Sequence, residues 1–396
     1  MIHSLKVFKT KMVEEKIEIL QVSTRIMKFF CILPKNGRYP TKFERVLLIC
    51  VLLNFSVLTV ISFLHLVYNT NNRTISLEEA IEDITVLFTT TGGLLIVGYI
   101  SFNSDKIIDF YETLRDFNRF SLPPETIKTN RTINLFTILW SSVGVLGSIL
   151  YYILRIKFDK KCEIYNEKYK RNDVCGMIAP TWLPFESDSN KFLIRLIEIN
   201  SFTPGIGAAC SIVIFLLGSS EMIVVRIKHL KKMLREAVQN KMGCDEKLKE
   251  CVRYHIHIIW LCERFNACFK KYYFLYFLQN SPLISIIGFN FIIDPSIPTI
   301  LNFFGWFLGL FFTCTVGQRL IDESTSIANE VYSTNWYEMD VSLQKTIQLI
   351  ILRANRPLRH TAWLYGVSSH LTFTQILKSS YSLVALLNTM YNKKVV

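Results

Sequence analysis

The last apolar stretch of the chain, residues 368–391, is long enough to cross a membrane but carries many side chains that are costly in lipid. A helix rises about 1.5 Å per residue, so this stretch would span the roughly 30 Å hydrocarbon core. Its polar residues are Thr372, Thr374, Gln375, Lys378, Ser379, Ser382 and Asn388. Polar groups inside a span normally face a water-filled path or bond to a neighbouring helix. The stretch therefore indicates either the lining of a pore or a tightly packed last helix, and the residue types alone leave both open.

The remaining residues that could do chemistry form weaker patterns. Cys251, His255 and His257 are candidate zinc ligands, but they share one amphipathic helical pattern, where ordinary packing is the better explanation. The chain has no G-x-S-x-G, P-loop or H-E-x-x-H motif, and no paired carboxylates at catalytic spacing in a span. We therefore expect no enzyme activity, no catalytic residue, no cofactor and no bound metal.

Composition places the chain among membrane proteins. Half of its 396 residues are apolar, 29 are Phe, and the mean hydropathy is +0.28. Seven apolar windows are long enough to span a bilayer, which predicts an all-α, seven-transmembrane helical protein. These windows are 43–68, 77–102, 133–156, 192–225, 272–293, 297–320 and 368–391.

The charge distribution predicts the orientation of the spans. The chain has 45 Lys and Arg against 32 Asp and Glu. If the N-terminus is cytoplasmic, the inner segments hold about three times as many Lys and Arg residues as the outer ones, in agreement with the positive-inside rule. Since orientation explains the basic excess, that excess gives no reason to expect nucleic-acid binding. The same orientation puts the C-terminus outside, opposite to a G-protein-coupled receptor.

Three expectations follow for the outer side. Asn72 begins an N-glycosylation triplet in the first outer loop, so we expect it to be glycosylated. Cys162 and Cys175 lie in the longest outer loop, 157–191, where an oxidising compartment makes a disulfide between them possible. The acidic start of the second span, which includes Asp83, is expected to project above the hydrocarbon.

The chain should divide into membrane and cytoplasmic parts. Apolar residues recur at helical spacing among charged ones in 226–271, so the fourth and fifth spans should continue as cytoplasmic helices. The expected parts are a cytoplasmic amphipathic segment at 1–42, spans one to four at 43–225, the cytoplasmic extensions at 226–271, spans five and six at 272–320, cytoplasmic anchor helices at 321–367, a pore-lining span at 368–391 and an outer tail at 392–396.

The C-terminal part carries a series of residues in a distinctive order. They are Cys314, Gly317, Glu323, Ser324, Tyr332, Trp336, Arg353, Pro357, Gly366, Phe373, Lys378, Ser380, Tyr381 and Ser382. This series resembles the C-terminal signature of insect odorant receptors, and the length, span count and orientation of the chain agree with that family. The last helix departs from the related gustatory receptors. The chain also lacks the large insert between the fourth and fifth spans that the shared odorant co-receptor carries.

The resemblance implies a ligand-tuning subunit of an odorant-gated, non-selective cation channel. Such a subunit would bind a small volatile molecule and assemble as a heterotetramer with the co-receptor. It would lie among membrane lipid in the plasma membrane of a sensory-neuron dendrite. A gustatory-type channel, a G-protein-coupled receptor and a transporter are the alternatives. A G-protein-coupled receptor would need an outward N-terminus and Asp-Arg-Tyr after the third span, and a transporter would usually show repeated halves.

Two sets of site residues follow from this resemblance and from the expected topology. Val384, Leu387 and Asn388 share one helix face where the family has a constriction, so we expect them to line the outer part of the pore. The odorant is expected in the outer half of spans two to six, where glycines leave space, aromatic rings line it and sparse hydroxyl groups bond. For each aromatic residue alone, core packing is the simpler explanation. The expected ligand-binding residues are Phe88, Thr89, Gly144, Gly147, Tyr151, Phe202, Ile206, Phe303, Phe304 and Phe307.

Overall fold

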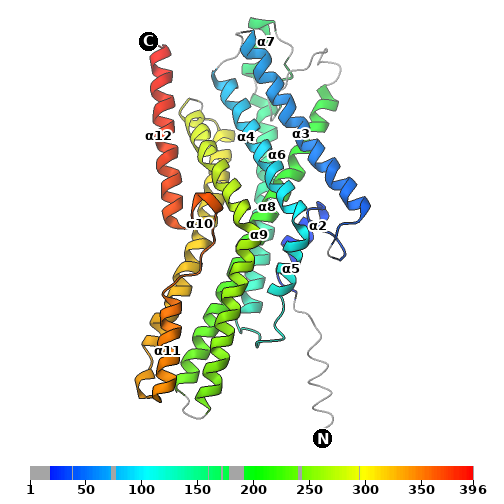
Figure 1. Cartoon of the computed structure of the whole chain (residues 1–396). Helices are drawn as coiled ribbons and strands as arrows, with labels where there is room; N and C mark the ends of the chain where they lie inside the picture. Colours follow the sequence, from blue (N-terminus) through cyan, green and yellow to red (C-terminus); the bar gives the residue numbers. More distant parts are fainter. Residues whose placement is uncertain are drawn as a thin grey trace.

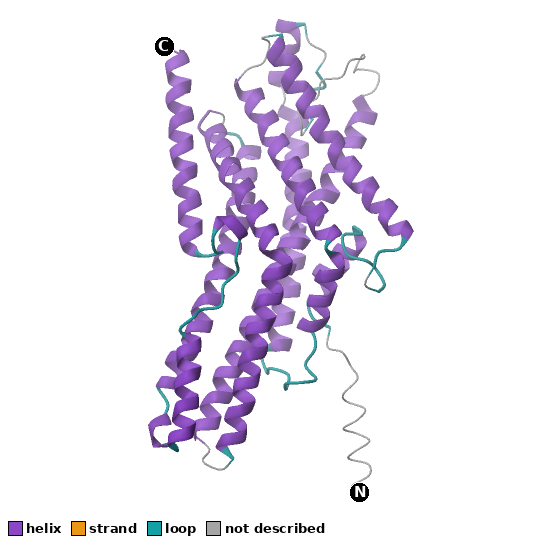
Figure 2. Ribbon diagram, in the orientation of Figure 1, coloured by secondary structure: helices purple, strands orange, loops and turns teal. Residues whose placement is uncertain are grey.

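A computed structural model describes residues 18–37, 39–72, 77–158, 160–170, 173–177, 191–239, 243–293 and 295–395. Within these residues the regular elements are helices, with one isolated bridge between Thr361 and Val367 (Figures 1 and 2). The helices are α2 (Gln21–Phe29), α3 (Lys42–Asn71), α4 (Leu77–Phe102), α5 (Ser104–Leu114), α6 (Thr126–Phe158), α7 (Lys160–Tyr169), α8 (Lys191–Gln239), α9 (Cys244–Ile293), α10 (Ile297–Tyr332), α11 (Val341–Ala354) and α12 (His370–Val395), with the 3-10 turns η2 (Trp336–Glu338) and η3 (Trp363–Tyr365).

The helices confirm the predicted fold class. Six of them, α3, α4, α6, α8, α9 and α10, are long and apolar enough to cross a membrane by length and composition. The seventh predicted window lies in α12, which has 26 residues and is therefore long enough, but it carries the polar residues noted above. All six apolar windows coincide with helices because a backbone in hydrocarbon must satisfy its own polar groups.

Helices α8 and α9 extend well beyond a bilayer. They have 49 and 50 residues, and each would be about 74 Å long as a straight helix. Figure 1 shows them beside α10 and α11 at the end of the molecule away from the C-terminus. Lys231 of α8 pairs there with Glu323 of α10, Nζ to Oε2 at 2.7 Å, and Ile347 of α11 is fully buried. The long helices thus build a second packed region outside the apolar layer.

The segment that leads into α12 is fixed to this packed core. His360 is fully buried, and its Nε2 lies 2.7 Å from Oγ of Ser220 on α8. Burial lowers the pKa of His360 to about 3, so the ring is neutral at physiological pH. Eight residues later, Ser368 donates a hydrogen bond to the carbonyl of Thr313 at 3.0 Å and lies directly against Gly317 of α10. The start of α12 is therefore set by contacts to α8 and α10.

We predict that Gly317→Ala destabilises the protein. A Cβ on Gly317 would overlap the carbonyl oxygen of Ser368, and overpacking of this kind costs about 1–3 kcal/mol. Gly305 on the same helix is a matched control, because a Cβ there meets nothing within 4 Å and helix propensity favours alanine. Thermal unfolding of the purified protein in detergent should show a lower melting temperature for Gly317→Ala only. Equal melting of the two variants would contradict this packing.

Candidate functional site

A buried amide joins α4 and α9 in the region where the ligand was expected. Gln279 of α9 is 7% exposed, and its Nε2 donates to the carbonyl oxygens of Phe88 at 3.2 Å and Thr89 at 3.4 Å. Gly92 makes this possible, because a Cβ there would overlap the Gln279 side chain. The Oε1 atom of Gln279 is buried and has no hydrogen-bond partner among the described residues. Sequence reasoning missed Gln279, although the adjacent amides Gln279 and Asn280 inside an apolar window were the available signal.

A second group of predicted residues lies where α6 packs on α8. A Cβ on Gly144 would lie 3.4 Å from Ile206 Cγ2 and 3.2 Å from Cys210 Sγ, so this glycine allows close helix packing. One turn outward, Gly147 has nothing within 4 Å of a Cβ position, and Tyr151 is half-buried. Phe202 lies on α8 as well, but its side chain is outside the described part. Of the predicted ligand-binding glycines, Gly147 is the one with open space.

The predicted aromatic residues of α10 pack toward α12. The Phe303 and Phe307 rings stack with centroids 5.8 Å apart, and Phe307 meets the Phe373 ring of α12 at 5.6 Å. Phe304 contacts Phe303 at 5.8 Å and is 51% exposed. These rings thus belong to the α10–α12 contact, and the predicted ligand-binding residues fall at three separate helix contacts.

One face of α12 packs on α9. Val384 is half-buried and lies near Gly288, where an added Cβ would be 3.5 Å from Val384 Cγ2; Leu387 and Asn388 are half-buried too. The Ser380 hydroxyl donates to the carbonyl of Ser281 on α9 at 3.0 Å. The opposite face is not covered by the described residues. The exposed polar residues of α12 include Thr374, Gln375, Lys378, Ser379, Ser382 and Thr389, and they alternate with exposed apolar residues, among them Leu371, Tyr381, Leu386 and Met390.

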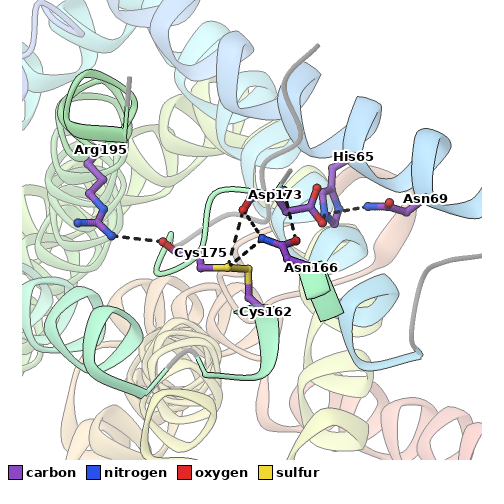
Figure 3. The surroundings of a disulfide bond; sticks show 7 residues. All are labelled: His65, Asn69, Cys162, Asn166, Asp173, Cys175 and Arg195. Carbon is purple, nitrogen blue, oxygen red and sulfur yellow. Dashed lines mark hydrogen bonds and ion pairs between the residues drawn. A yellow bond between two sulfur atoms is a disulfide. The ribbon is translucent and has the colours of Figure 1, made fainter. Parts of the chain in front are cut away.

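The outer loop is closed by a disulfide between Cys162 and Cys175 (Figure 3). Asn72 is exposed at the end of α3, and the rest of its acceptor triplet lies outside the described residues. Asp83, in the acidic start of α4 that is expected to project above the hydrocarbon, is fully buried within the protein. Its Oδ2 lies 2.7 Å from Nδ1 of His65 on α3, and this partner on another helix is what allows the carboxylate to be buried.

The described residues also form a cavity of about 560 Å³ at the far end of α8 and α9. Charged and polar residues, among them Arg235, Glu338 and Asp340, contribute to its walls. Sites for apolar molecules are lined mainly by apolar and aromatic side chains, so this cavity does not suit such a ligand.

Comparison with known proteins identifies the family. The sequence model described as 7tm Odorant receptor matches residues 76–381. Putative odorant receptor 85d of Drosophila melanogaster is 34% identical over 150 residues, which are 37% of this chain and 36% of that protein. Odorant receptor 85b of the same organism is 23% identical over 329 residues, covering 80% of this chain and 83% of that protein.

A solved structure shares the fold. The insect olfactory receptor OR5 from Machilis hrabei in complex with eugenol matches with a TM-score of 0.75 at 16% identity, covering 95% of this chain and all of that one. A second structure of the same receptor matches with a TM-score of 0.73. Because the family model covers more than half of the sequence, the chain belongs to the 7tm odorant receptor family.

Proposed function

We propose that this chain is the odorant-binding subunit of a heteromeric, odorant-gated, non-selective cation channel in the plasma membrane of a sensory neuron. The co-receptor subunit supplies the remainder of the pore. The observation that supports this most is the polar face of α12 that the chain itself leaves uncovered. The expected division into spans 43–225 and 272–320, cytoplasmic anchor regions and a last span at 368–391 is part of the proposal.

Lys378 makes the case for a water-filled path. It is exposed on α12 together with Ser382 and Thr389, one and three turns further along. A lysine at the centre of a lipid-facing helix costs about 2.5–3.5 kcal/mol on insertion scales. Neighbouring subunits around a conducting path would remove this cost, because the face would then meet water and protein. Val384, Leu387 and Asn388, expected to line the outer part of the path, are half-buried on the other side of α12, which packs on α9, so the cysteine test below decides which side meets the path.

The ligand is proposed to bind among α4, α6, α8, α9 and α10 in their outer halves. The open space at Gly147 and the buried, unpartnered Oε1 of Gln279 support this assignment. The structure of a family member in complex with eugenol supports a small organic ligand. A volatile of about ten heavy atoms would bind with roughly 5–8 kcal/mol, so affinity should be modest and led by shape.

We predict that the chain conducts only with its partner. Expression in oocytes or cultured cells together with the co-receptor should give currents in response to part of a volatile panel, because the pore needs other subunits. The chain alone, at matched surface expression, should give little current. Robust ligand-gated current from the chain alone would refute the heteromeric assignment.

Cysteine substitution tests the pore residues. Val384→Cys, Leu387→Cys and Asn388→Cys should each make agonist-evoked current sensitive to a thiol reagent, because a lining side chain is reached from water. Ile376→Cys is the control, since Ile376 is 1% exposed within the chain. The parent receptor gives the baseline for its native cysteines. If all three pore variants behave like the control, α12 is a packing helix at these positions.

Changes of ligand ranking test the binding region. Gly147→Leu fills the space on α6 and should shift sensitivity toward shorter ligands, with currents from co-receptor agonists unchanged. Tyr151→Phe removes one hydroxyl group and should weaken oxygen-bearing ligands by roughly threefold to tenfold, the effect of one hydrogen bond. Hydrocarbon ligands are the internal control for Tyr151→Phe. An unchanged ranking in both variants would put the ligand elsewhere.

A further inference from the structure

A buried polar cluster joins the outer ends of α3 and α4 to the disulfide loop. His65 is 2% exposed and lies less than two turns from the outer end of α3. Its Nδ1 lies 2.7 Å from Asp83 Oδ2 on α4, and its Nε2 lies 3.5 Å from Asp173 Oδ2 of the loop. Asn69, one turn further out, places its Nδ2 3.0 Å from the same Nε2. One imidazole therefore contacts two helices and one loop.

Several contacts hold the loop backbone that carries Asp173 (Figure 3). The disulfide closes it between Cys162 and Cys175, two residues from Asp173. Asn166 of α7 donates from Nδ2 to the Asp173 carbonyl at 2.8 Å. Arg195 of α8 donates to the Cys175 carbonyl at 3.3 Å. The backbone at Asp173 is thus held independently of its carboxylate, and the carboxylate reaches across to His65.

The Nε2 atom of His65 faces two groups that require different protonation. In the neutral ring with hydrogen on Nδ1, which donates to Asp83, Nε2 has a lone pair and accepts from Asn69. A buried carboxylate beside that lone pair has no attraction to it. When Nε2 takes a proton from the outer solution, it becomes a donor and the ring becomes a cation that pairs with Asp173. The hydrogen bond to Asp83 is present in both forms.

We propose that His65 is a proton-operated latch that docks the disulfide loop onto α3 and α4 through Asp173. Among the described residues, the charged groups that contact the ring are Asp83 from α4 and Asp173 from the loop. Glu79 and Glu82 of α4 act on Asp83, and Arg195 of α8 lies behind the loop. Protonation closes the latch, and loss of the proton releases the carboxylate while α3 and α4 stay joined. The latch does not depend on channel function.

The latch lies above the proposed ligand region. Phe88 and Thr89 follow Asp83 on α4 by little more than one turn, toward the membrane interior. The docked loop would therefore restrain the outer end of α4. The next turns of the same helix contact Gln279 through the Phe88 carbonyl.

A double-mutant cycle across pH tests the latch on the purified full chain in detergent. At pH 6, Asp173→Asn should lower the melting temperature by roughly 2–4 °C, the shift expected for an interaction worth about 1 kcal/mol. His65→Gln should lower it further, because it also removes the hydrogen bond to Asp83. The double variant should melt like His65→Gln alone, because the contact that Asp173→Asn removes is already absent. At pH 10 the effect of Asp173→Asn should vanish in the parent chain.

Glu163→Gln supplies the matched control, because Glu163 is an exposed carboxylate on α7 in the same loop. It should add independently to His65→Gln at both pH values. Coupling of equal size at pH 6 and pH 10, or full additivity of His65→Gln and Asp173→Asn at pH 6, would overturn the proposal.

A measurement without variants covers the case in which a substitution prevents folding. Hydrogen exchange of the amides at 173–177 in the unmodified protein, with labelling times scaled for the intrinsic pH dependence, should speed up as pH rises. A flat corrected profile would also overturn the latch.

Discussion

A polar atom buried in an apolar layer must find a partner inside the protein, and this constraint organises the structure. Between α4 and α9 the amide of Gln279 bonds backbone carbonyls, and between α9 and α12 the hydroxyl of Ser380 does the same. At the outer end His65 and Asp83 satisfy one another. These bonds join helices that apolar packing alone would leave free to slide. On the uncovered face of α12 the hydroxyls of Thr374, Ser382 and Thr389 bond to carbonyls of their own helix, and Lys378 is the charged group that this face exposes.

The packed region that α8, α9, α10 and α11 form outside the apolar layer fixes the place where α12 begins. Asn266 of α9 makes two hydrogen bonds to the connecting segment. Its Nδ2 donates to the Arg359 carbonyl at 2.8 Å, and its Oδ1 accepts from the Thr361 amide at 2.9 Å. His360 lies between these two residues and stacks on the Tyr273 ring with centroids 5.9 Å apart. These contacts hold the connecting segment in place, although it has no helical structure.

The sequence was sufficient for the spans because they depend on local composition, and the apolar windows all became helices. It was less informative wherever a residue's role depends on a neighbour far away in the chain. The burial of Asp83 was not predicted, because its partner His65 is on another span. Gln279 was overlooked because the glycine that admits it, Gly92, is on α4. The contact of the α10 rings with α12 was not predicted either, because helix periodicity does not tell which neighbour a face will meet.

The position of Gln279 has one mechanical consequence. Two residues further along α9, Ser281 accepts the Ser380 hydrogen bond, and its own hydroxyl lies 3.2 Å from that of Ser379. The contacts of α9 to α4 and to α12 are thus separated by about 3 Å along a single helix axis. Pro282 lies in the same turn and has no N–H to donate to the carbonyl of Leu278. The turn of α9 that meets both α4 and α12 is therefore one that lacks a backbone hydrogen bond, and such turns are where helices bend.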